Sequence, residues 1–366
     1  MLAPLALGLA SGRGMAATGP SAEEQAEMGR LALRFMQEHA MPGLSVAVAR
    51  YGELLYQGAF GFADQENGER VDPLHVFRIA SVSKPITSVA IFALIEQGYA
   101  SLDSTVFGAA GILRHEFGAP PYQPYVEQIR LRHLLTHTAG GWPNMANDPM
   151  FSHTDLEARQ LIRWTIANVP LTSAPGQRYA YSNFGYCILG RVIEMLSQRA
   201  YEEHVSDTLL RRCGISAMRI GQNLAGARHP KEVKYYGGSG EEPYRIYLSR
   251  MDSHGGWVAS PTDLVKFASH VDGFSAGRNL LRPSTIADMT TPTRANQQYA
   301  CGWGVNQYHN WWHAGSLPGT SSVLVRNARG FCWAAVGNSR ERSGDTSGAL
   351  DALMWTMVKT VRGWGV

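Results

Sequence analysis

The pattern of hydrophobic and polar positions divides the chain into two end regions with strand patterns and a middle with helical patterns. Near the N-terminus, residues 22–39 have the spacing of an amphipathic helix, and the alternating runs 44–50 and 53–60 predict a β-hairpin. Further strands are expected towards the C-terminus, at 299–307, 311–314, 321–326 and 331–336.

Helices are expected over 81–98, 156–168, 184–199, 201–213 and 348–362, with one more that opens at Ser260-Pro261. The simplest arrangement of these elements is a sheet that is built from both ends of the chain and has helices packed on it. The sequence therefore predicts an α+β fold with an antiparallel sheet flanked by helices. We expect a discontinuous sheet domain of residues 21–102 and 244–366, and a mostly helical inserted domain of residues 103–243.

Composition and charge exclude several classes of partner. The 366 residues are 45% hydrophobic, and 33 basic against 30 acidic residues give a formal net charge of +3. Such a near-balance is not typical of a protein that binds nucleic acid or an anionic membrane surface. No apolar run has the length of a membrane span. We therefore expect a small-molecule or short peptide substrate as the partner, and the oligomeric state stays open.

The first 20 residues are set apart from the fold as a leader. They contain a short apolar run followed by small residues, which resembles the end of a secretory signal, although the basic start of such a signal is missing. The alternative is a disordered leader. We expect an exported or periplasmic protein, with a cytoplasmic one as the alternative.

Cysteine and histidine spacing indicates neither a metal nor an organic cofactor. The four cysteines form no C-x-x-C pair, and the sequence contains no H-E-x-x-H motif and no phosphate-binding glycine loop. His133 and His137 are four residues apart, but we interpret them as structural. One disulfide stays open if the protein is exported, because pairing cannot be read from sequence.

The first candidate for chemistry is the pair Ser81 and Lys84. Lysine occurs at only five positions, and no other serine has a lysine three residues later. Residues i and i+3 share one helix face, so a lysine amine that has lost its proton could activate the serine hydroxyl. The start of a helix also supplies backbone N–H groups for an oxyanion. The alternative is an ordinary helix start with a capping serine.

The second candidate is Tyr181-Ser182-Asn183, just ahead of the helix expected at 184–199. A tyrosine hydroxyl can pass protons, and an asparagine amide can hold both a substrate carbonyl and a lysine amine. Whether Lys84 or Tyr181 is the formal base stays open. The alternative is a loop tyrosine next to a helix cap.

The third candidate is His313-Ala314-Gly315, at the end of an expected strand. Glycine would let a substrate lie along the strand edge, and the N–H of Ser316 could join that of Ser81 as an oxyanion donor. The alternative is a strand that ends in a glycine turn.

These three motifs, in this order, resemble the S-x-x-K, Y-x-N and K/H-x-G motifs of the serine β-lactamase and penicillin-binding-protein superfamily. The resemblance covers residues 30–360. It implies that Ser81, Lys84 and Tyr181 are catalytic and that Asn183, His313, Gly315 and Ser316 bind substrate or form the oxyanion site. The α/β-hydrolase alternative is set aside, because none of the three motifs is the G-x-S-x-G nucleophile motif of that fold.

The resemblance implies a serine hydrolase that works through an acyl-serine intermediate on small esters or amides. We expect a carboxylesterase-like activity, because His313 stands where most class C β-lactamases have a lysine that can hold a carboxylate. A histidine of ordinary pKa is mostly neutral at pH 7, and carboxylate substrates should then gain as the pH falls. The alternative is a D-amino-acid peptidase, a DD-carboxypeptidase or a weak β-lactamase. A non-catalytic binding protein is disfavoured because all reactive positions are present.

Overall fold

A seven-stranded antiparallel sheet forms one side of the protein in a computed structural model, which describes residues 19–145, 147–238, 240–274, 277–341 and 344–364. The strand order is β3-β2-β1-β10-β9-β8-β7. The strands are β1 (Gly43–Arg50), β2 (Glu53–Asp64), β3 (Glu69–Arg70), β7 (Gly304–Val305), β8 (Trp311–Leu317), β9 (Thr320–Arg326) and β10 (Phe331–Gly337). Strands from both ends of the chain meet where β1 pairs with β10, with Val46 opposite Ala335. The predicted α+β fold is therefore confirmed.

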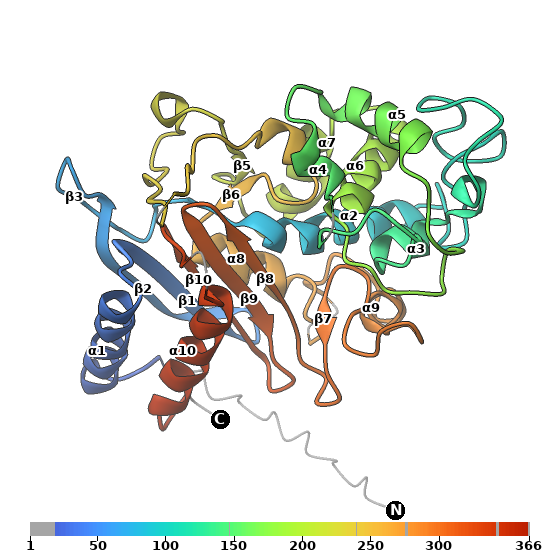
Figure 1. The fold of residues 1–366 in the computed structure, drawn as a ribbon. Helices are drawn as coiled ribbons and strands as arrows, with labels where there is room; N and C mark the ends of the chain where they lie inside the picture. Colours follow the sequence, from blue (N-terminus) through green and yellow to red (C-terminus); the bar gives the residue numbers. More distant parts are fainter. Residues whose placement is uncertain (1–18, 146, 239, 275–276, 342–343, 365–366) are drawn as a thin grey trace, which may run out of the picture.

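Helices cover both faces of the sheet (Figure 1). The two terminal helices, α1 (Ala22–Glu38) and α10 (Thr346–Thr360), pack on one face, and α8 (Pro261–Ser269) packs on the other. Along β9, Val323 belongs to the core under α1 and α10, and Leu324 belongs to the core on the opposite face. Because both faces are covered, every residue of β1, β9 and β10 is buried.

The remaining α-helices of the described residues lie beside the sheet (Figure 1). They are α2 (Ser83–Glu96), α3 (Leu131–Leu135), α4 (Pro149–Ser152), α5 (Ala158–Asn168), α6 (Asn183–Ser197), α7 (Tyr201–Val205) and α9 (Pro283–Thr290). A second sheet has the order β4-β6-β5, with strands β4 (Phe77–Arg78), β5 (Arg219–Ile220) and β6 (Trp257–Ala259). The sequence did not predict this sheet, because strands of two or three residues leave no measurable alternation.

Local chemistry fixes the start of two helices. Ser21 caps α1 and forms a reciprocal capping box with Glu24. Ser260 caps α8 by accepting a hydrogen bond from the backbone N–H of Asp263, and Pro261 occupies the first helical position. The expected leader, residues 1–20, lies outside the described residues apart from Gly19 and Pro20.

Three expected elements differ from the structure. The strand expected at 299–307 is reduced to β7, because the chain turns at Gly302, whose φ of +79° favours glycine. The helix expected at 201–213 changes to π-helical geometry at Ser206 and to 3₁₀ geometry at Arg211. The helix expected at 81–98 begins with a 3₁₀ turn, Ala80–Val82, before α2 starts.

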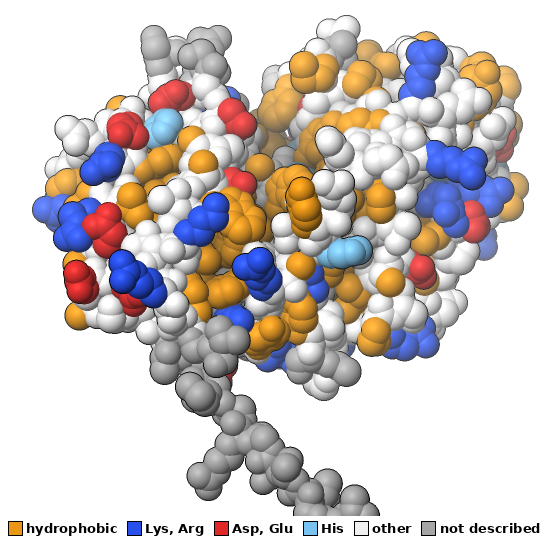
Figure 2. All heavy atoms as spheres, turned by 90° about the horizontal axis from the view of Figure 1, so that it is seen from below, with side chains coloured by type: hydrophobic (Ala, Val, Ile, Leu, Met, Phe, Trp, Pro, Cys, Tyr) orange, Lys and Arg blue, Asp and Glu red, His pale blue; other side chains and the backbone are white. Residues whose placement is uncertain are grey.

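The described surface shows no large field of one charge on the face drawn in Figure 2. Lys and Arg side chains are mixed with Asp and Glu at its left and right margins, and hydrophobic side chains lie between them. None of the helices in the described part of the chain is long and apolar enough for a bilayer crossing. All four cysteines are buried and free, so the disulfide that the sequence left open is not formed.

Candidate active site

Ser81 lies in a strained turn that the large sheet holds in place. The residue before it, Ala80, has a φ of +47°, a conformation that costs free energy for any residue with a Cβ atom. Two side chains of β9, Thr320 and Ser322, each donate a 2.7 Å hydrogen bond to the backbone carbonyl groups of the two residues preceding Ala80. These bonds fix the turn and leave Ser81 partly exposed at the surface of a cavity.

Lys84, one helical turn after Ser81, is fully buried and has three partners. Its Nζ atom lies 3.0 Å from Ser81 Oγ, 2.8 Å from Asn183 Oδ1 and 2.9 Å from the carbonyl oxygen of His254. Burial lowers the pKa of Lys84 to about 7, and the Asp148 carboxylate opposes this shift. A substantial fraction of Lys84 is therefore a neutral amine near pH 7.

The partners of Lys84 decide where its lone pair points. A neutral amine has two N–H bonds and one lone pair. Asn183 Oδ1 and the His254 carbonyl can only accept hydrogen bonds, so they take both N–H bonds. The lone pair is left for the third partner, the hydroxyl proton of Ser81, at an N–O distance of 3.0 Å. This arrangement can remove the proton from Ser81.

Asn183 is the first residue of α6, and polar groups hold it on three sides. Its Nδ2 donates to Asp148 Oδ2 at 3.0 Å, and its backbone N–H donates to Asn144 Oδ1 at 2.7 Å. The other Asp148 oxygen accepts from the backbone N–H of Met150 at 2.9 Å. Burial raises the pKa of Asp148, and its hydrogen bonds and the charge of Lys84 oppose that rise.

Tyr181 contacts both members of the first pair. Its hydroxyl is hydrogen-bonded to Ser81, and the Lys84 Nζ atom lies 4.8 Å from the centre of its ring. Burial raises the pKa of Tyr181 above its ordinary value, although the hydrogen bond with Ser81 opposes the shift. The phenol therefore keeps its proton at neutral pH and can donate it.

The free edge of β8 runs past Ser81. In the described residues, β7 pairs with β8 only at Trp311 and Trp312, which leaves the edge open from residue 313 onward. A Cβ atom at Gly315 would lie 3.1 Å from the backbone nitrogen of Ser81, so strand and turn are in close contact. Ser316 follows on this edge, and its Oγ accepts a 2.9 Å hydrogen bond from Arg340.

His313 is present at this site but is held in a neutral form. Its Nδ1 lies 2.7 Å from the carbonyl oxygen of Ala314, which can only accept, so Nδ1 carries the proton. Its Nε2 lies 3.1 Å from the hydroxyl of Tyr299, and the same hydroxyl lies 3.1 Å from His137 Nε2. Because His137 Nδ1 accepts from the backbone N–H of Ser182, the hydrogen bonds run from His137 through Tyr299 to His313.

Burial, reinforced by the charge of Lys84, lowers the pKa of His313 to about 3. The expectation that His313 gains a proton and favours carboxylates as the pH falls is therefore wrong. A sequence supplies only the ordinary pKa of histidine, whereas His313 is 6% exposed and its two ring nitrogens are both engaged.

Two cavities meet at Ser81 and Ser316. The first, which we call the aromatic cavity, has a volume of about 490 Å³. It is lined by Ser81, Tyr179, Tyr181, Asn296, Gln298, Tyr299, Gly304, Trp312, His313, Ala314, Gly315, Ser316, Asp345 and Ser347. The second, the Arg340 cavity, has a volume of about 530 Å³. It is lined by Ser81, Asn144, Asp148, Phe151, Asn183, Met251, His254, Gly255, Ser316, Leu317, Pro318 and Arg340.

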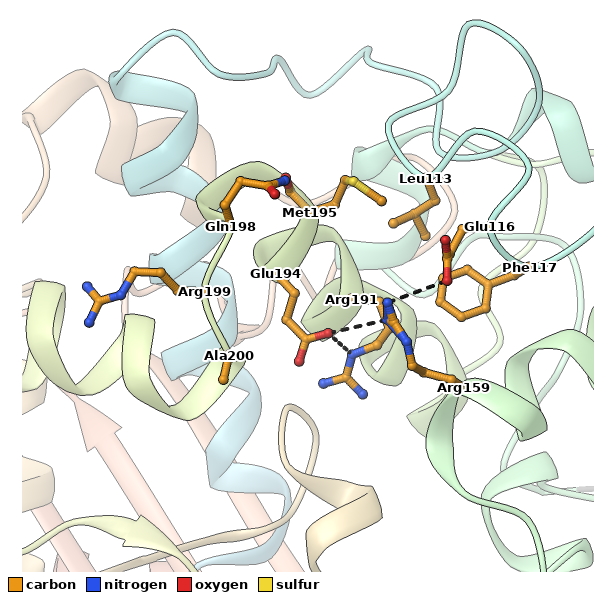
Figure 3. Close-up of a pocket in the computed structure, with 10 residues that line it drawn as sticks. All are labelled: Leu113, Glu116, Phe117, Arg159, Arg191, Glu194, Met195, Gln198, Arg199 and Ala200. Carbon is orange, nitrogen blue, oxygen red and sulfur yellow. Dashed lines mark hydrogen bonds and ion pairs between the residues drawn. The ribbon is translucent and has the colours of Figure 1, made fainter.

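A third cavity, of about 310 Å³, lies between α5 and α6 and does not include Ser81 (Figure 3). Arg159 stands there between the carboxylates of Glu116 and Glu194, at 3.5 and 3.7 Å. Arg191 pairs with the same Glu194 at 2.9 Å. These ion pairs satisfy the charges within the cavity, so we interpret it as a structural network.

The structure brings together all the residues that the sequence singled out. Ser81, Lys84, Tyr181, Asn183, His313, Gly315 and Ser316 all lie at or between the two cavities that meet at Ser81. The sequence analysis missed Asp148, Asn144 and Tyr299, and it treated His137 as structural. No short motif marks these four residues. Within the described ranges, no group of three or more His, Cys, Asp or Glu residues could hold a metal ion.

Comparison with known proteins supports one family. The model of the family described as Beta-lactamase matches residues 28–353. Protein flp of Staphylococcus aureus (strain MRSA252) is 22% identical over 301 residues, which are 80% of this chain and 58% of that protein. Penicillin-binding protein 4* of Bacillus subtilis (strain 168) is 24% identical over 326 residues, which cover 79% of this chain and 66% of that protein. The chain thus spans about three fifths to two thirds of the length of these curated relatives.

Solved structures have the same fold. The D-amino acid amidase from Ochrobactrum anthropi SV3, complexed with L-phenylalanine, superposes with a TM-score of 0.76 at 20% identity, covering 93% of this chain and 99% of that one. SurE with D-Leu superposes with a TM-score of 0.71 at 25% identity, covering 93% of this chain and 76% of that one.

Proposed function

The chain belongs to the beta-lactamase family of serine hydrolases, and from this premise we propose that it hydrolyses small esters through an acyl-enzyme on Ser81. One observation carries the proposal: the lone pair of the buried Lys84, a substantial fraction of which is neutral near pH 7, is directed at the Ser81 hydroxyl. A binding protein without catalysis would not need a buried lysine whose amine is kept near its neutral form, because burying that amine costs free energy.

In the proposed reaction, Lys84 takes the hydroxyl proton of Ser81 while Ser81 Oγ bonds to the carbonyl carbon of the ester. The oxyanion that forms accepts hydrogen bonds from the backbone N–H groups of Ser81 and Ser316. When the intermediate collapses, the C–O bond to the alcohol breaks, and Tyr181 gives the departing alkoxide its phenol proton. Tyr181 regains a proton from Lys84, and water later releases the acid by the same route in reverse.

The charges around the cavities favour neutral substrates. Neutral His313 offers a carboxylate no positive charge. The guanidinium of Arg340 lines the second cavity but is paired with Glu241, with N–O distances of 2.6 and 3.0 Å, so its charge is already compensated. Tyr179, Tyr181 and Trp312 line the aromatic cavity and suit an apolar acyl or alcohol group, whereas Trp142, Trp257, Trp303 and Trp311 belong to the core.

A second candidate is an amidase or peptidase for D-amino-acid derivatives. The carboxylate of Asp345 is exposed and lines the aromatic cavity, where it could pair with the ammonium group of an amino-acid substrate. The similarity to a D-amino acid amidase agrees with such a substrate. DD-carboxypeptidase and β-lactamase activities rank lower, because their substrates carry a free carboxylate.

A substrate panel on one preparation tests the proposal. It consists of p-nitrophenyl butyrate, a chromogenic cephalosporin, a D-Ala-D-Ala peptide and a D-amino-acid amide. We expect kcat/KM to be highest for the butyrate ester, and a higher value for the amide would select the second candidate. Ser81→Ala should abolish turnover, and a fluorophosphonate should label only the peptide that contains Ser81, at that residue. Labelling at Ser83 or Ser182 would contradict the assignment.

A further inference from the structure

The side-chain amide of Asn183 lies between Asp148 and Lys84, and its two ends are chemically different. Its Nδ2 donates to Asp148 Oδ2 at 3.0 Å, and its Oδ1 accepts from Lys84 Nζ at 2.8 Å. A carboxylate can only accept hydrogen bonds, so it selects the NH₂ end of the amide. Asp148 thereby turns the carbonyl end of Asn183 towards Lys84.

This orientation decides the position of the Lys84 lone pair. If the amide were reversed, its NH₂ group would face the amine, and the Lys84 lone pair would turn towards that N–H instead of the Ser81 hydroxyl. A protonated Lys84 would then face an N–H donor instead of an acceptor. With the observed orientation, the hydrogen bonds run in one direction from Ser81 through Lys84 and Asn183 to Asp148.

We infer that Asp148 is a positioning residue, which acts through Asn183 to direct the Lys84 lone pair at Ser81 and to stabilise Lys84 when it takes the proton. The inference rests on the proposed function of Ser81 and Lys84 and adds the residue that orients them. Its role resembles that of the carboxylate that fixes the histidine tautomer in Ser-His-Asp enzymes.

Asp148 is well placed to carry this role because it is 9% exposed and both its oxygens are used. One oxygen holds Asn183, and the other accepts from Met150 N at the start of α4. The other titratable groups that face Lys84 are Tyr181, Tyr186, His137, His254 and His313. Burial keeps these tyrosines and histidines neutral at pH 7, which leaves Asp148 as the acid that opposes the lowering of the Lys84 pKa.

The test measures the rate at which a fluorophosphonate acylates Ser81 between pH 5 and 9, so no natural substrate is needed. In the unaltered protein the rate should fall below a pH of about 7, where Lys84 becomes protonated. Asp148→Asn keeps the cap of α4 but removes the charge and one acceptor. The pH below which the acylation rate falls, which we call the acid limb, should move down by about one pH unit. The plateau rate should fall about tenfold or more, a part of the usual contribution of a general base.

Two further variants separate orientation from general damage. Asn144→Ala removes an uncharged partner of the same Asn183, so its acid limb should stay at the position of the unaltered protein. The double variant Asp148→Asn/Asn183→Asp restores the direction of the hydrogen bonds. The amide introduced at position 148 then donates to the new carboxylate at position 183, which accepts from Lys84. This exchange should recover a large part of the lost rate and move the acid limb upward.

The inference is overturned if Asp148→Asn leaves the acid limb unchanged, or if the exchanged pair is no faster than Asp148→Asn in a folded protein. Failure of the proposed function looks different. In that case Lys84→Arg would keep the acylation rate, and protonation of Lys84 would not be the cause of the fall in rate at low pH.

Discussion

Gly315 lies so close to the Ser81 turn that a Cβ atom at this position would be 3.1 Å from the backbone nitrogen of Ser81. The same atom would be 2.3 Å from the carbonyl oxygen of Ile79 and 2.4 Å from Ser322 Oγ. Backbone atoms cannot move out of the way as the end of a flexible side chain can. The glycine therefore sets the distance between β8 and Ser81, and with it the geometry of the two N–H groups proposed to bind the oxyanion.

Gly315→Ala should consequently lower kcat for p-nitrophenyl butyrate by much more than any loss of folded protein can explain. Displacing one oxyanion donor typically costs about 10²–10³-fold in rate. Ester turnover and the thermal unfolding midpoint should be measured on the same sample. Gly226→Ala is the matched control, because a Cβ atom there meets nothing within 4 Å. Normal turnover of Gly315→Ala would show that β8 does not contribute to the reaction.

Lys84→Arg should remove most of the activity although it keeps a positive charge. Arginine does not release its proton in proteins, so it cannot accept the Ser81 proton. The expected loss is about 10²–10⁴-fold in kcat/KM for p-nitrophenyl butyrate. Lys266→Arg, an exposed replacement on α8, controls for the substitution itself. If Lys84→Arg turned over at the rate of Lys266→Arg, Lys84 would be structural.

Tyr299→Phe should destabilise the fold. The hydroxyl of Tyr299 joins His137 and His313, and all three side chains are buried, with exposed fractions of 7%, 1% and 6%. Without it, two buried ring nitrogens lose their partner, which costs about 1–3 kcal/mol for each group left unsatisfied. Urea unfolding measures the free energy of unfolding. Tyr179→Phe, which removes a partly exposed hydroxyl in the same cavity, should cost much less. Equal losses in the two variants would contradict the role of Tyr299.

The sequence predicted those parts of the site that depend on local spacing. Ser81 and Lys84 share a helix face because they are three residues apart. Gly315 directly follows the strand expected at 311–314, although β8 continues through it to Leu317. The fold class was predictable for a similar reason, since alternation and helical periodicity persist over whole elements such as β1 and α1. Both patterns involve residues that are close in sequence, so they can be recognised without knowing which distant segments contact one another.

The partners that orient the site could not be predicted, because they meet only through the tertiary fold. Asp148 lies 35 positions before Asn183, and His137 lies 162 positions before Tyr299. Tyr299 also falls in a segment that was expected to be a strand, and the turn at Gly302 brings it to His313 instead. The pKa of His313 depends on its burial, and the spacing of residues in the sequence does not show whether a side chain is buried.

Burial of His313 leads to a last prediction, which concerns the ratio of kcat/KM for a chromogenic cephalosporin to that for p-nitrophenyl butyrate. Both reactions need neutral Lys84, so its protonation cancels in the ratio. A histidine of ordinary pKa, about 6.5, would become charged between pH 7.5 and pH 5 and would attract the cephalosporin carboxylate. A charged contact of about 1.5–3 kcal/mol would raise the ratio roughly tenfold to a hundredfold. Because the pKa of His313 is about 3, the ratio should instead stay flat over this range.

His313→Asn, which cannot become charged, should give the same flat profile. A ratio that rises as the pH falls in the unaltered protein, but not in His313→Asn, would mean that His313 titrates and serves as a carboxylate anchor.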